Sequence, residues 1–84
     1  MEAKARAFAE EAIWSLGRGD AASARTFIAQ AAEVDHRLGP LADCVYLACS
    51  EIDAEGVVST ATWNTLADAV DSAELLAVVE GSRG

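Results

Sequence analysis

The 84-residue sequence is poor in proline, histidine and cysteine, with one, one and two of these residues, and it has no long uninterrupted apolar run. Because no apolar stretch approaches about 18 residues and no apolar segment follows a basic N-terminus, we expect neither a membrane-spanning helix nor a signal peptide. Apolar residues nevertheless make up 52% of the chain. Many of them are alanine, which favours helix. This composition predicts one folded domain over residues 1–80, followed by a disordered tail at 81–84.

Motifs that carry catalysis are also missing from the sequence. There is no glycine-rich phosphate loop, no nucleophile elbow and no second histidine to act beside His36. Asp35, His36, Asp43 and Cys44 are of metal-ligand types, but their spacing matches no zinc pattern. We therefore expect no enzymatic activity, no cofactor and no metal.

The two cysteines are too badly placed to form a disulfide with each other. Cys44 and Cys49 are five residues apart on one predicted helix, so their side chains point about 140° apart. Two free thiols fit a reducing compartment, so we expect a cytoplasmic protein with both thiols shielded.

Basic residues are scarce in the second half of the chain. The formal net charge is -8, and residues 42–84 hold eight acids against Arg83 alone. Such an acidic protein repels phosphate backbones, so we expect no nucleic-acid partner.

The stretch from Pro40 to Asp53 predicts the central helix of the fold. Pro40 suits a first helical turn, and Gly56 provides a stop. Apolar residues cover well over half of its circumference, and only Asp43 and Ser50 mark a polar strip. We therefore expect a central helix buried by neighbours on two sides. The residues expected to pack together are Leu41, Val45, Ala48 and Ile52 against Phe8, Leu16, Phe27 and Ile28.

Apolar periodicity predicts further helices on both sides of this stretch. The first spans 2–16, and the second runs from the N-cap Asp20 to about Val34, which gives an antiparallel hairpin. After Gly56, Ser59 or Thr60 can cap a fourth helix, and Asp71 with Glu74 resembles a capping box that could divide it in two. The predicted fold is an all-α, compact helical bundle of four to five helices.

The predicted hairpin resembles a tetratricopeptide motif over about residues 5–36. The positions that match the family's small and large apolar pattern, its turn and its helix end are Phe8, Ala12, Gly19, Asp20, Ala24, Ile28, Ala31, Val34 and Asp35. The positions that depart from the pattern are Glu11, Ser15 and His36. The resemblance implies protein binding without catalysis, although a single motif lacks the three or so repeats that build the family's peptide groove.

Residues 51–59 form an acidic segment that is similar to an EF-hand calcium loop. Glu51, Asp53 and Glu55 stand at loop positions 1, 3 and 5, followed by Gly56. Thr62 occupies the position of the bidentate glutamate, which removes two oxygen ligands. The alternative function is therefore an ion- or ligand-responsive helical domain that uses this segment.

The remaining candidate site is the back face of the first helix. Trp14 lies about 180° from the apolar stripe of that helix, in line with Ala3 and Ala7. Either the C-terminal segment folds over this tryptophan, or a partner buries it. We predict a non-catalytic protein–protein interaction domain, an adaptor, regulator or self-associating subunit. Its partner-binding residues would be Ala3, Ala7 and Trp14, and a homodimer or another protein would bury them.

Overall fold

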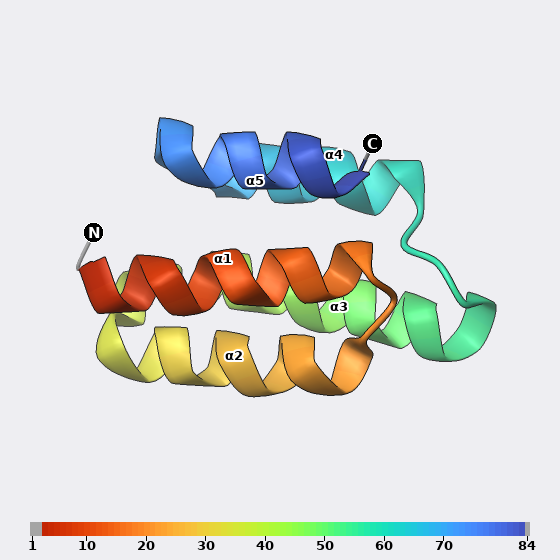
Figure 1. Ribbon diagram of the computed structural model, residues 1–84, viewed down its shortest axis with the longest axis horizontal. Coiled ribbons are helices and arrows are strands. Elements are labelled where there is room, and N and C mark those ends of the chain that lie inside the picture. The colour runs from red at the N-terminus through yellow and green to blue at the C-terminus, as the bar shows by residue number, and fades with distance from the viewer. Residues whose placement is uncertain (1–2, 84) are drawn as a thin grey trace.

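The computed structural model describes residues 3–83, which form five α-helices and one short 3-10 helix (Figure 1). Their bounds are α1 Ala3–Gly17, α2 Ala21–Val34, η1 His36–Leu38, α3 Gly39–Glu55, α4 Thr60–Ala69 and α5 Ala73–Arg83. The predicted all-α helical bundle is confirmed. Within the described range, each helix is too short or too polar to span a bilayer.

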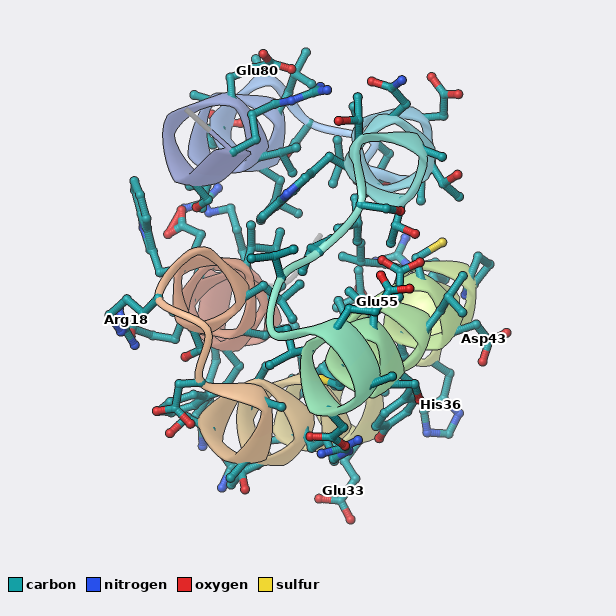
Figure 2. All side chains as sticks on the ribbon, turned by 90° about the vertical axis from the view of Figure 1, so that its right-hand side faces the viewer. Arg18, Glu33, His36, Asp43, Glu55 and Glu80 are labelled. Atoms are coloured by element: carbon teal, nitrogen blue, oxygen red, sulfur yellow. The ribbon has the colours of Figure 1, made fainter. Side chains whose placement is uncertain are left out.

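The helices form two layers. Helices α1, α2 and α3 pack together, and α4 and α5 lie side by side across them, with α5 against α1 and α4 against α3 (Figures 1 and 2). Each connection reverses the chain, so α1, α3 and α5 run in one direction and α2 and α4 in the other (Figure 1). The first and last helices are therefore parallel neighbours.

Local sequence signals set most helix ends. The Asp20 carboxylate accepts a hydrogen bond from the Ser23 N–H at 3.0 Å and caps α2. Gly56 adopts a φ of 85° and closes α3, with its N–H donating to the Ile52 carbonyl. Ser59 caps α4 by accepting from the Thr62 N–H. All three ends agree with the residues expected to make them.

Residues 70–72 separate α4 from α5, which resolves the choice between one helix and two. The cap of α5 is Ser72, whose hydroxyl accepts from the Leu75 N–H at 3.2 Å, in place of the predicted Asp71. Helix α5 then continues to Arg83, so residues 81–83 form its last turn where we predicted a disordered tail. The Arg83 guanidinium donates to Asn64 of α4 at 2.8 Å, which ties this turn to the bundle. Residue 84 of the predicted tail lies outside the described residues.

Side chains from all five helices form one hydrophobic core. The largest apolar side chains that are fully buried are Ile13, Ile28, Leu41, Val45, Leu66, Leu75 and Val79. Helix α1 contributes mainly small residues, Ala5, Ala9 and Ala12, which have no exposed surface. Small residues let neighbouring helix backbones approach closely, so α1 can be covered by α2, α3 and α5 together.

Helix α3 is central, but it is not covered all round. Leu41, Val45 and Ala48 are buried as predicted, whereas Ile52 is only half-buried. Tyr46 and Leu47 are 41% and 53% exposed, which contradicts the expectation that only a narrow polar strip faces solvent. The reason is the arrangement of layers: α5 packs on α1 rather than on α3, so one face of α3 has no neighbour.

Candidate functional site

Trp14 lies at the seam between α1 and α5. A Cβ atom added to Gly81 would be 3.0 Å from Cη2 of Trp14, so the far edge of the indole rests over this glycine. The indole is nevertheless 40% exposed. The C-terminal helix therefore covers one portion of the ring, in line with the first alternative, and leaves another portion open to solvent.

Ala3 and Ala7 lie along α1 on the same side as Trp14, and both are exposed. Their spacing of four and seven residues places them in one row with the tryptophan. The Glu11 and Arg18 side chains, also exposed, border this row. The three predicted residues thus form one solvent-facing strip, which we call the Trp14 strip, with small side chains beside one large aromatic.

Other large apolar side chains are exposed at separate places. They are Val34 of α2, Tyr46 and Leu47 of α3, Val57 in the α3–α4 connection and Leu76 of α5. Single exposed apolar residues are normal on soluble proteins. Tyr46 and Leu47 were missed in the sequence because they belong to a stretch that is apolar nearly all round, where periodicity cannot show which side faces solvent.

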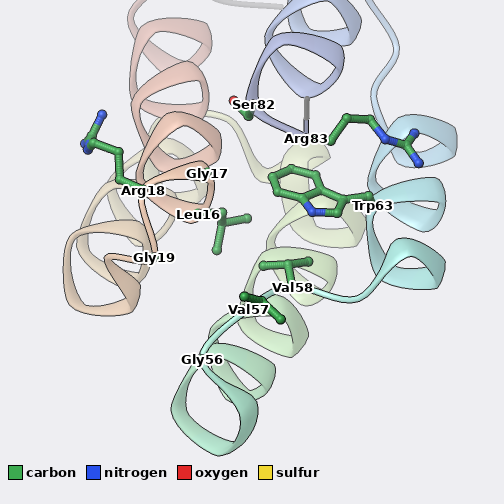
Figure 3. A pocket seen from close by; sticks show the side chains of 10 residues that line it. All are labelled: Leu16, Gly17, Arg18, Gly19, Gly56, Val57, Val58, Trp63, Ser82 and Arg83. Carbon is green, nitrogen blue, oxygen red and sulfur yellow. The ribbon is translucent and has the colours of Figure 1, made fainter.

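A pocket of about 400 Å³ opens at the end of the bundle where α1, α3 and α5 terminate (Figure 3). Its lining residues are Leu16, Gly17, Arg18, Gly19, Gly56, Val57, Val58, Trp63, Ser82 and Arg83. The side chains of Leu16, Val58 and Trp63 form an apolar wall. Sequence reasoning did not find this pocket, because its parts come from four segments that only the tertiary fold brings together.

Two of the three acids of the EF-hand-like segment are engaged within the chain. Glu51 accepts hydrogen bonds from the Thr62 hydroxyl at 2.6 Å and from the Ser59 N–H at 2.8 Å, and so ties α3 to the start of α4. Asp53 pairs with Arg25 of α2 at 2.6 Å. Among residues 3–83, no three His, Cys, Asp or Glu side chains come close enough together to hold a metal ion.

The contacts of Glu51 predict a pH dependence of stability. Hydrogen bonds from Thr62 and Ser59 lower the pKa of the Glu51 carboxyl below its ordinary 4.5. A lowered pKa stabilises the fold above the unfolded-state pKa, and this stabilisation is lost as pH falls through the folded-state value. We therefore expect the melting temperature of the parent protein to fall more steeply below about pH 4.5 than that of Glu51→Gln.

Thermal unfolding followed by circular dichroism at steps between pH 6 and pH 3 tests this expectation. The difference between parent and variant isolates Glu51 from the other acids with lowered pKa values, such as Asp20 and Asp35. Parallel curves for the two proteins would show that Glu51 does not link α3 to α4 as its contacts indicate.

Asp35, which precedes His36, is the N-cap of the 3-10 helix η1. Asp35 accepts from the side chain and the N–H of Arg37 at 3.0 Å, and these bonds lower its pKa from 3.8 to about 2. His36 is exposed. The thiols of Cys44 and Cys49 are free, as expected, and burial raises the pKa of both. Cys49 is fully buried, but Cys44 is only half-buried and so is less shielded than predicted.

Comparison of the chain with models of known protein families, with curated proteins and with solved structures gives no match.

Proposed function

We propose that this protein is a non-catalytic protein–protein interaction domain that associates with a second copy of itself through the Trp14 strip. The observation that carries the proposal is the state of Trp14, which is 40% exposed although α5 already covers part of its ring. Tryptophan is enriched among residues that dominate binding energy, because it buries a large rigid surface at a small cost in entropy.

The surroundings of Trp14 support an approach by another helix. Ala3 and Ala7 are small, so a helix backbone can come close to α1 beside the indole. Residues 1–41 hold six acids and five bases, so this half of the protein is nearly neutral. Two copies therefore repel each other less there than through the acidic residues 42–84.

The helical hairpin and the free thiols are two further observations that support the proposal. The antiparallel pair of α1 and α2 occupies residues 3–34 and overlaps most of the range of the tetratricopeptide resemblance, about 5–36, and members of that family bind proteins. We place the protein in the cytoplasm because both thiols are free.

Trp14→Ala is expected to weaken self-association. Loss of a central tryptophan should cost at least about 2 kcal/mol, which is roughly thirtyfold in affinity. Sedimentation equilibrium over a range of protein concentrations measures this change, and circular dichroism checks that the helices remain.

Tyr46→Ala is the matched control, because Tyr46 is an aromatic residue of almost the same exposure, 41%, on the open face of α3. We expect this variant to associate like the parent. A parent protein that stays monomeric at all concentrations would refute the proposal, as would equal weakening by both variants.

A further inference from the structure

Two opposite charges, Glu11 and Arg18, flank Trp14 along α1. Glu11 precedes the tryptophan by three residues and Arg18 follows it by four. The Arg18 N–H still donates to the Trp14 carbonyl at 3.1 Å, so helical geometry extends to this arginine. Seven residues are close to two helical turns, so both charged side chains leave the same side of the helix, about 10 Å apart along its axis. The Trp14 strip therefore has an acid before its aromatic residue and a base after it.

Neither of these charges is neutralised within the part of the chain that the structure describes. Glu11 and Arg18 are both exposed, and neither takes part in an ion pair among residues 3–83. The Arg18 guanidinium donates to the neutral Ser15 hydroxyl at 3.0 Å and projects from the side of α1 that faces away from α3 (Figure 2). A guanidinium has five N–H donors, so Arg18 can also bind a carboxylate.

A second copy of α1 running in the opposite direction matches this order of charges. In a two-fold symmetric contact, each pairing of residues occurs twice. If the two-fold axis passes beside Trp14, an antiparallel copy brings Glu11 of each chain opposite Arg18 of the other. A parallel copy would bring Glu11 level with Glu11 and Arg18 level with Arg18, and these like charges repel. The charges on the strip therefore favour the antiparallel direction.

Helix α5 leaves room for a second indole beside Trp14. Gly81 lies at the far edge of the Trp14 ring and has no side chain. Ala77, one turn earlier on α5, is small and exposed. The partner's indole can therefore approach the open part of the ring without meeting a large side chain from these two positions. Two tryptophans that meet in this way can stack with an offset, a favourable arrangement of aromatic rings.

We propose that two copies of this protein associate with their α1 helices antiparallel, Trp14 against Trp14 at the two-fold axis and two Glu11–Arg18 ion pairs beside it. This inference rests on the self-association proposed above and adds its direction and its charge specificity. The second copy is the partner that this surface fits, because the surface carries both members of each ion pair.

Reversing one charge at a time tests the direction. Glu11→Arg and Arg18→Glu should each weaken self-association about tenfold, because each variant replaces two attractive pairs by two repulsive ones. Glu11→Arg also removes two units of the net charge of -8, so its expected loss runs against the change in overall repulsion. The double variant should associate within about twofold of the parent, since its ion pairs are restored in reverse. Sedimentation equilibrium measures each affinity, and circular dichroism checks the fold.

Two further samples serve as controls. An equimolar mixture of the two single variants should associate like the parent, because two bases on one chain then face two acids on the other. Glu33→Arg makes the same change in net charge at an exposed position of α2, and should change the affinity less than about twofold.

The outcomes separate this inference from the proposal on which it rests. If the parent associates and Trp14→Ala weakens it, but Glu11→Arg does not, the antiparallel arrangement is wrong and self-association through Trp14 stands. Failure of the double variant to recover would also overturn the arrangement. A parent that stays monomeric would overturn both.

Discussion

Leu66→Ala is expected to lower the free energy of unfolding by about 2–5 kcal/mol. Leu66 is fully buried on α4, the helix that packs against both α3 and α5. Truncation leaves a cavity that the surrounding helices cannot fill without shifting. A domain of this size has a stability on the order of 5–10 kcal/mol, so the loss is a large part of the whole. Urea unfolding followed by circular dichroism measures it.

Ile52→Ala is the comparison for this prediction. The sequence placed Ile52 in the main core stripe, but the structure leaves it half-buried near the end of α3. Its truncation should therefore cost about half as much as that of Leu66 or less. If Ile52→Ala proved the more damaging variant, the end of α3 would be more enclosed than the packing of α4 and α5 indicates.

Gly17→Ala is expected to destabilise the protein by about 1–3 kcal/mol. A Cβ atom at this position would lie 3.0 Å from the carbonyl oxygen of Ser82 and 3.1 Å from its Cβ. Both atoms belong to or adjoin the backbone of α5, so the methyl group can be accommodated only if α1 and α5 move apart. The same urea titration measures the loss.

Gly81→Ala is a matched variant with the opposite expectation. Its Cβ would also meet an atom at 3.0 Å, but that atom is Cη2 of Trp14, the far end of a partly exposed side chain that can move. Replacing a helical glycine by alanine favours the helix by up to about 1 kcal/mol. Stability should therefore stay the same or rise. An equal loss at both glycines would mean that the α1–α5 separation is not limited by the Ser82 backbone.

The fold was predictable where short-range chemistry determines it. Asp20, Gly56 and Ser59 act on the residues next to them, and the structure uses all three as helix ends. The division between α4 and α5 was visible as a polar interruption, but Asp71 and Ser72 are both capable caps and local sequence cannot choose between them. Helix α5 continues to Arg83, which contacts Asn64, nineteen residues earlier, and no local pattern contains such a contact.

The candidate sites were likewise predictable only where residues of a single helix determine them. Helical spacing was enough to place Ala3, Ala7 and Trp14 on one strip, because all three belong to one helix. It could not show that α5 would bring Gly81 to the edge of the Trp14 indole. Nor could it show that Tyr46 and Leu47 of α3 would be exposed to solvent. These outcomes depend on which helix of the first layer α5 packs against, α1 or α3. The pocket depends on the same choice, since Ser82 and Arg83 complete its rim.

The parallel arrangement of α1 and α5 has a practical consequence for attaching other proteins to this one. With an odd number of helices, the first begins at one end of the bundle and the last finishes at the other, along a longest dimension of 33 Å (Figure 1). A fusion partner or affinity tag joined before α1 therefore sits far from the cavity. One joined after Arg83 emerges at the cavity mouth and would obstruct it, so immobilisation for ligand screening should use the N-terminal side.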